Sequence, residues 1–322
     1  MRKLIHYVFL LCSILLLHQY GIFLVHSLQE VDNNDNYSTN STKHEQGHEP
    51  LVPAPKADNT KDEGTFGTVS YRLYHNEYPS LWHDVPLTPK STSEDNVINF
   101  ITEIPMYYSS KMELSKEEPN NPIMQDTNKD GSPRYYSYGV SFFNYGLIPQ
   151  TWEDPELLTD GIGGDNDPLD VMEVGSHPFK IGSITPCRVI GSLLLIDEGE
   201  TDYKILCIST SDPDAKHIHS TEDLEKIKPG YLDNLRLWLK RYKTTDGKPE
   251  NNLAQDEPYD LTKTLDIIKE THDRWNMLCG NSRRRLNYSL YGGDAETEDE
   301  EKKEDMDVSK YGFSLASKNC RG

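Results

Sequence analysis

Residues 165–171 read Asp-Asn-Asp-Pro-Leu-Asp-Val, so three carboxylates fall within six residues around a proline. In an extended chain Asp165 and Asp167 share one face, and Pro168 cannot occupy a central ladder position, so the run predicts a strand leading into a loop. Carboxylates this close repel one another, which a hard divalent cation such as Mg²⁺ relieves. The stretch therefore predicts a cation site, with a solvated Asp-rich turn as the alternative.

A second acidic stretch runs from Asp197 to Lys204, between the apolar runs 189–196 and 205–208. This pattern predicts two strands joined by an acidic hairpin turn. If the turn folds against residues 165–171, four or five carboxylates meet in one cleft beside Lys204. Such a cleft suits metal-assisted phosphoryl chemistry.

Two other motifs resemble metal sites but differ from them in detail. Residues 126–131 match the start of an EF-hand loop, but Pro133 and Ser137 stand at positions 8 and 12, where Ser137 replaces the required glutamate. A β-turn is predicted there instead. Residues 44–48 match H-E-x-x-H, but an internal glycine, a following proline and the lack of an apolar stripe argue against the necessary helix.

Apolar periodicity predicts a half-buried sheet covered by helices. Alternation predicts strands over residues 68–74, 97–104 and 111–114. Apolar stripes at helical spacing predict helices over residues 229–242 and 260–278. We expect both helices to pack on the sheet.

The two ends of the chain differ in composition from its middle. Residues 1–27 open with two basic residues and continue apolar, which predicts a signal peptide, with an uncleaved anchor as the alternative. Residues 28–63 are polar, carry two glycosylation sequons and predict a disordered linker. Residues 64–291 then form the folded domain, and residues 292–322 an acidic disordered tail.

Charge and targeting limit the partners and the compartment. A net charge of −20 argues against a nucleic-acid partner. No membrane association is expected unless residues 1–27 stay uncleaved. The signal predicts the secretory pathway or an organelle, whereas a downstream start would give a cytoplasmic protein.

Cysteine usage does not predict a disulfide-stapled scaffold. The five cysteines show no paired spacing, and Cys12 would leave with a signal peptide. Cys187 and Cys207 lie in apolar strand runs, which predicts reduced core residues.

Several blocks in order carry a resemblance to a known family. The stretch 165–171 fits the signature of the soluble family I inorganic pyrophosphatases at every position. Four further blocks resemble the eukaryotic branch of that family: residues 149–155, 195–202, 246–251 and 267–273. The match extends from about Thr68 to Met277, and several independent blocks in the right order are more specific than any single motif.

The resemblance implies a mainly β protein with flanking helices, built on an OB-like, highly twisted β-barrel with a polar cavity. It implies Mg²⁺-dependent hydrolysis of pyrophosphate, a small-molecule substrate, to two orthophosphates. Several Mg²⁺ ions are expected per site. Other divalent cations are expected to substitute, and Ca²⁺ to inhibit because its bonds are longer and its geometry looser.

The resemblance also assigns roles by position. Asp167 is expected to be the general base for a metal-activated water. Asp165, Asp170 and Asp202 are expected to bind the activating metal pair with Asp170 as the bridge, and Glu113 and Asp197 to hold further metals. The phosphates are expected to contact a basic and phenolic set, and Glu103 to line the cavity. That set is Lys111, Arg134, Tyr145, Lys204, Tyr242 and Lys243.

Two positions depart from the family pattern. Ser141 stands four residues before Tyr145, where the family often carries a second tyrosine, and the loop from Arg134 to Tyr145 is shorter than usual. Met106-Tyr107 replaces an Arg-Trp pair at the eukaryotic dimer contact. The first departure leaves one substrate or metal-water contact open, and the second leaves a homodimer open.

Two alternative functions differ in chemistry. A hydrolase of organic polyphosphates or nucleotides would use the same cations on another substrate. A non-catalytic, acidic calcium-binding protein of the secretory pathway would explain the signal, the sequons and the charge. It would not explain the basic and phenolic residues that recur around the carboxylates.

Overall fold

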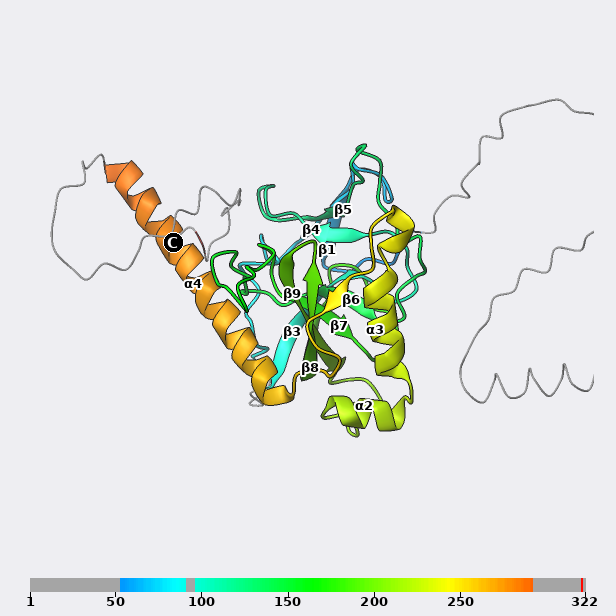
Figure 1. Cartoon of the computed structure of the whole chain (residues 1–322). Helices are drawn as coiled ribbons and strands as arrows, with labels where there is room; N and C mark the ends of the chain where they lie inside the picture. Colours follow the sequence, from blue (N-terminus) through cyan, green and yellow to red (C-terminus); the bar gives the residue numbers. More distant parts are fainter. Residues whose placement is uncertain (1–52, 91–95, 292–319, 321–322) are drawn as a thin grey trace, which may run out of the picture. The chain divides into compact units, whose positions relative to one another are not determined.

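The computed structural model describes residues 53–90, 96–291 and 320, with the side chains of 281–291 left aside. Within these ranges, ten strands form two sheets (Figure 1). The smaller sheet has the order β1-β2-β5-β4, and all of its neighbouring strands are antiparallel. Its strands are β1 (Thr60–Glu63), β2 (Arg72–His75), β4 (Met112–Leu114) and β5 (Ile123–Gln125).

The larger sheet has the order β10-β8-β3-β6-β7-β9, and β8 also pairs with β9. This last pairing closes five strands into a barrel, the arrangement typical of an OB-like fold. Strands β7 and β9 are parallel, and the other pairs are antiparallel. Its strands are β3 (Val97–Ile104), β6 (Asn144–Leu147), β7 (Asp170–Glu173), β8 (Ile184–Asp197), β9 (Glu200–Ser209) and β10 (Asn252–Leu253).

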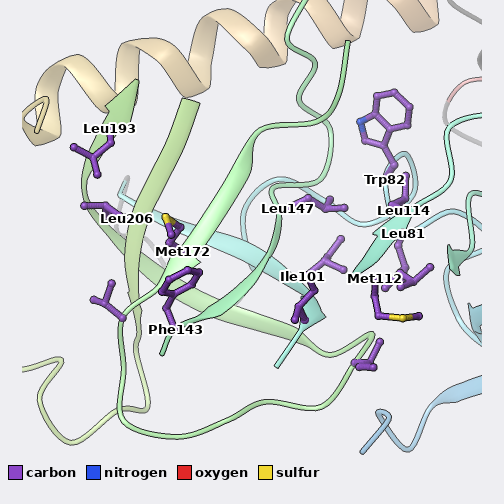
Figure 2. Packing of buried hydrophobic residues seen from close by; sticks show 14 of the residues in the cluster. Leu81, Trp82, Ile101, Met112, Leu114, Phe143, Leu147, Met172, Leu193 and Leu206 are labelled. Atoms are coloured by element: carbon purple, nitrogen blue, oxygen red, sulfur yellow. The ribbon is translucent and has the colours of Figure 1, made fainter. Parts of the chain in front are cut away.

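Helices flank the barrel strands, as Figure 1 shows for α3 (Tyr231–Arg241) and α4 (Leu261–Tyr291). The buried stripe of α3 packs into a large core cluster that also contains Phe143, Met172 and Leu206 (Figure 2). Ile267 and Ile268 of α4 join a second cluster that contains alternate residues of β7, β8 and β9. The short helix α2 (Thr221–Ile227) begins at Ser220, whose hydroxyl accepts from the Asp223 N–H. The predicted barrel with flanking helices is confirmed.

Three details differ from the sequence-based expectations. Residues 165–168 are not a strand that leads into a loop: they form a loop, here called the acidic loop, and strand β7 begins after it at Asp170. Pro168 explains the order, because it has no N–H for a ladder and so precedes the strand. Strand 68–74 is displaced as well, since β2 begins only at Arg72.

The third detail concerns the ends of the expected domain. Residues 60–63, expected in the disordered linker, form β1 along β2, and Ala54 and Ala57 are buried before it. Polar composition concealed this strand, because three of its four residues are exposed. Near the other end, Cys320 is buried and disulfide-bonded to Cys279, although the acidic tail was expected to be disordered.

Cys187 and Cys207 are buried and reduced, as predicted. Among the described helices, none is both long and apolar enough to span a membrane. The predicted signal peptide, both sequons and the H-E-x-x-H match lie outside the described residues.

Candidate active site

A cavity of about 320 Å³ opens between strand β4 and the acidic loop. Strands β3, β4, β6 and β7 each contribute to its wall. Six of the predicted site residues line this cavity: Glu103, Lys111, Glu113, Tyr145, Asp167 and Asp170. The remaining predicted residues lie in ionic and hydrogen-bonded groups around it, described in turn below.

Lys204 joins the carboxylates of two neighbouring strands. The parallel register of β7 and β9 sets Asp170 opposite Lys204, and Asp202 precedes Lys204 by two residues on the same face. The Lys204 ammonium contacts Asp170, lies 2.6 Å from Asp202 Oδ2 and donates to the Tyr145 hydroxyl at 3.0 Å. The Tyr145 hydroxyl in turn donates to Asp170. Four predicted residues thus form one buried network.

Burial and like charge set the protonation of these groups. Burial raises the pKa of Asp202 to about 7, although nearby Lys204 acts to lower it. Burial and then Asp170 raise the pKa of Glu103 well above its ordinary value. Burial acts to lower the pKa of Lys204, but Asp170 and Asp202 outweigh it and raise that pKa. Excess negative charge in this region is therefore only partly compensated by the protein itself.

The acidic loop is held against the segment 149–155. The Glu153 N–H donates to the Asp167 carbonyl at 2.8 Å, and the Glu153 carbonyl accepts from the Asn166 N–H at 3.0 Å. Gly164 permits this approach, because a Cβ there would lie 2.6 Å from the carbonyl carbon and oxygen of Glu153. Asn166 adopts a left-handed φ of 70°, which asparagine tolerates well. These contacts therefore fix the backbone of the loop that carries the carboxylates of Asp165 and Asp167.

Asp167 contacts a basic residue that the sequence did not indicate. The Lys116 ammonium lies 2.7 Å from Asp167 Oδ1 and donates to the Asn166 carbonyl at 3.1 Å. Burial raises the pKa of Asp167, and Lys116 acts in the opposite direction. The same lysine thus holds both the loop backbone and its carboxylate.

Lys111 and Arg134 share a carboxylate partner on the cavity rim. Lys111 Nζ and Arg134 Nη1 each lie 3.0 Å from Asp126 Oδ2, and Lys111 also lies 2.8 Å from Glu113. Arg134 Nη2 reaches Asp246 at 3.3 Å. The two predicted phosphate ligands are therefore positioned together by Asp126.

A second pair of predicted phosphate ligands converges on the tip of the acidic hairpin. Lys243 Nζ lies 2.6 Å from Asp197 Oδ2, and the Tyr242 hydroxyl donates to that oxygen at 3.4 Å. The end of α3 positions both residues. As predicted, the hairpin places its acids between two strands, β8 and β9, and next to basic residues.

Ser141 stands where the family often carries a tyrosine, and Tyr136 provides another phenol in the site. Ser141 is fully buried, and its hydroxyl has no hydrogen-bond partner among the described residues. Tyr136 is buried close enough to Lys111, Lys204 and Asp170 for their charges to act on its phenol. At the expected dimer contact, Met106 is buried and Tyr107 is 61% exposed.

Sequence reasoning missed four residues of the site: Asp126, Lys116, Tyr136 and Glu153. Asp126 was assigned to a β-turn, and only the pairing of β4 with β5 sets it beside Lys111. Glu153 lies in the block 149–155 that carried part of the resemblance, so a signal for it existed. The contact of Lys116 crosses 51 residues of sequence and has no local signal.

The donor set fits a hard divalent cation. One carboxylate oxygen from each of Glu153, Asp165 and Asp202 lies within 4.8 Å of the other two. Asp202 Oδ1 and Glu153 Oε2 are buried and have no hydrogen-bond partner among the described residues. Oxygen ligands of this kind are those that Mg²⁺ and Ca²⁺ take in proteins. Asp170, expected to bridge the metal pair, contacts Lys204 and Tyr145.

Comparison with known proteins gives consistent matches. The family model described as inorganic pyrophosphatase matches residues 100–276. A chloroplastic soluble inorganic pyrophosphatase of Arabidopsis thaliana is 43% identical over 239 residues, covering 72% of this chain and 78% of the relative. Human inorganic pyrophosphatase is 40% identical over 230 residues, covering 68% and 78%. The N-terminally truncated vacuolar soluble pyrophosphatase of Trypanosoma cruzi, solved in complex with PPi, aligns with a TM-score of 0.65 and 34% identity, covering 79% of this chain and 100% of that one.

Proposed function

The chain belongs to the inorganic pyrophosphatase family, and from that premise we propose that the cavity beside the acidic loop is the site at which it hydrolyses pyrophosphate. The observation that carries the proposal is the interleaving of charges. Lys111, Arg134, Lys204 and Lys243 each pair with a carboxylate, and Lys111 lines the cavity together with Glu113, Asp167 and Asp170. A cation-binding protein without catalysis needs the carboxylates but not this ring of basic groups.

The family implies a divalent metal cofactor, and Mg²⁺ is the ion proposed here, with several ions per site. Asp165, Asp170 and Asp202 are proposed to hold the activating ions, and Glu113 and Asp197 the further ones. When bound, such ions lower the pKa of a coordinated water and neutralise charge on both phosphates. The unpartnered buried oxygens of Glu153 and Asp202 support a cation at this place.

The basic and phenolic groups are proposed to bind the substrate oxygens. Lys111 and Arg134 both contact Asp126. A phosphate oxygen can therefore replace one of these carboxylate contacts without a large movement of either side chain. Lys204, Tyr145, Tyr242 and Lys243 are proposed to bind in the same way around the other side of the site. Glu103 lines the cavity between the two groups.

Asp167 is proposed to take the proton of the attacking water. The water oxygen forms a bond to one phosphorus, the bridging P–O bond breaks, and the second phosphate leaves with the bridging electron pair. The Asp167 carboxylate lines the cavity, and Lys116 orients it from 2.7 Å. Two orthophosphates result from one pyrophosphate and one water.

Targeting and assembly complete the proposal. Residues 1–27 are proposed to direct the protein to the secretory pathway or an organelle, and the chloroplastic relative supports organelle targeting. Sequencing the mature N-terminus after expression from Met1 tests this, and an uncleaved protein in the cytosol contradicts it. Sedimentation of the purified protein tests whether the chain forms a homodimer.

Orthophosphate release by the purified chain tests the function. With Mg²⁺, release from pyrophosphate should exceed release from ATP or tripolyphosphate by several orders of magnitude, and EDTA should abolish it. Faster release from ATP would favour the nucleotide hydrolase. Mg²⁺ or Ca²⁺ binding without any release would favour the non-catalytic calcium-binding protein.

A further inference from the structure

Glu153 is a buried carboxylate that no role above uses. Its side chain is 3% exposed, in the segment that braces the acidic loop. Its Oε1 accepts from the Tyr203 N–H at 3.0 Å, while Oε2 has no hydrogen-bond partner within the described part of the chain. A buried carboxylate oxygen without a partner is strongly disfavoured. This oxygen therefore requires a ligand.

Asp202 presents the same situation next to it. Its Oδ2 pairs with Lys204, whereas its Oδ1 is buried and has no partner in the described region. Asp165, which is half-buried, completes the group, and one oxygen from each residue lies within 4.8 Å of the other two. Three converging acids, of which two carry unpartnered buried oxygens, form a site whose negative charge Lys204 only partly compensates.

The size of this group suits one cation. Oxygens on opposite sides of Mg²⁺ lie about 4.2 Å apart, and those on opposite sides of Ca²⁺ about 5 Å, given bond lengths of about 2.1 and 2.5 Å. The three oxygens lie within 4.8 Å of one another, a range that both ions can span. A single divalent ion can therefore contact all three residues.

We propose that Glu153 is a further ligand of the divalent cation held by Asp165 and Asp202, an assignment that rests on the proposed function. Asp170 does not belong to this group of three, because its carboxylate contacts Lys204 and Tyr145. The segment 149–155 thus supplies a carboxylate in addition to those of the acidic loop and strand β9. The Tyr203 N–H holds this carboxylate, and Asn166 and Asp167 hold the Glu153 backbone.

Glu153→Gln separates cation binding from a structural role. Glutamine keeps an oxygen to accept from the Tyr203 N–H but removes the negative charge. Titration calorimetry with Mg²⁺, and Mn²⁺ titration followed by electron paramagnetic resonance, should show the tightest site weakened by roughly 10- to 100-fold, as when a ligand or its support is lost. The melting temperature in EDTA should be unchanged or higher, because a like charge leaves the cluster. Glu156→Gln, an exposed change three residues away, should alter neither quantity.

The outcomes separate this inference from the proposed function. Unchanged cation affinity in Glu153→Gln, with wild-type protein that hydrolyses pyrophosphate, overturns the inference alone. A lower melting temperature in EDTA with unchanged affinity assigns Glu153 a purely structural role and also overturns it. If Glu153→Gln does not fold, Glu153→Asp provides the second variant and should weaken Mg²⁺ more than Ca²⁺, because the shorter side chain reaches a larger ion more easily. Wild-type protein that binds Mg²⁺ but releases no orthophosphate overturns the proposed function instead.

Discussion

At the scale of single residues, Lys204 shows why the site requires ionic partners. Its side chain is 3% exposed, and its ammonium contacts both Asp170 and Asp202. Three charged groups therefore lie together where little solvent reaches them. Removing one partner from a buried group of this kind typically costs about 3 to 5 kcal/mol, because the remaining charge is uncompensated. Exposed pairs such as Lys269 with Asp273 contribute far less, because solvent screens both charges.

His83 gives a residue-scale prediction for pH. Burial lowers the pKa of His83 to about 3, and Trp275 Nε1 donates to its Nδ1 at 2.8 Å. The unfolded chain takes up this proton near pH 6.5 and the folded chain does not, so the stability contribution is present above pH 6.5 and is lost as pH falls toward 3. Between pH 7.5 and 5.5 the loss is about 1.4 kcal/mol.

Urea unfolding at these two pH values checks the prediction. On acidification from pH 7.5 to 5.5, the unfolding free energy of His83→Gln should fall by about 1.4 kcal/mol less than that of wild type. The exposed change His217→Gln should behave like wild type. An identical acid loss in His83→Gln and wild type would show that His83 is not kept neutral by the fold.

At the scale of elements, helix α4 positions the segment that carries Glu153. The Trp152 N–H donates to the Thr271 carbonyl at 3.1 Å, and His272 Nδ1 lies 2.6 Å from the Gln150 carbonyl. Trp82 Nε1 donates to the Thr151 carbonyl at 2.7 Å from the other side. The segment 149–155 is therefore fixed between helix α4 and the buried Trp82.

Gly164→Ala should disturb this arrangement directly. The added Cβ would meet the Glu153 backbone at 2.6 Å, so the acidic loop must move away. We expect a loss of about 1 to 3 kcal/mol in unfolding free energy and weaker Mg²⁺ binding. Gly280→Ala in α4 is the matched control, since nothing lies within 4 Å of a Cβ there. Wild-type Mg²⁺ affinity in Gly164→Ala would show that the loop is not held by this contact.

Strand β1 gives a second element-scale prediction. Starting the chain at residue 64 removes the β1–β2 pairing and the buried Ala54 and Ala57, whereas starting it at residue 53 keeps them. The unfolding free energy of the shorter chain should be lower by at least about 2 kcal/mol. In a domain of this size that lowers the melting temperature by roughly 4 to 8 °C. Equal melting temperatures for the two chains would mean that β1 does not stabilise the fold.

The sequence alone predicted the barrel and most of the site, for identifiable reasons. Apolar stripes predicted α3 and the first half of α4, because these helices bury one face. Apolar alternation predicted β3, although all eight of its residues are buried. The two acidic stretches, residues 165–171 and 197–204, predicted the aspartates of the candidate site. Lys116 and Asp126 were not predictable, because their contacts depend on pairing between distant strands and loops. Strand β1 was missed because it is mostly exposed and polar.

At the scale of the whole molecule, one disulfide ties the C-terminal end to the domain. Cys279 of α4 bonds to Cys320 across 41 residues of sequence. Closing a loop of this length is expected to stabilise the folded state by on the order of 4 kcal/mol through the unfolded chain. The double change Cys279→Ser and Cys320→Ser should lower the melting temperature, and reductant should lower only that of wild type. Labelling of Cys279 and Cys320 by a thiol reagent in native, unreduced wild-type protein would contradict the pairing.

The most direct measurement of the central claim is the turnover of Asp167→Asn on pyrophosphate at saturating Mg²⁺. If the cavity beside the acidic loop is the catalytic site and Asp167 takes the proton of the attacking water, the variant should bind Mg²⁺ and substrate but lose turnover by on the order of 10²- to 10⁴-fold. Asp160→Asn, an exposed change in the same region, should keep wild-type turnover. Turnover near the wild-type rate in Asp167→Asn would contradict the assignment.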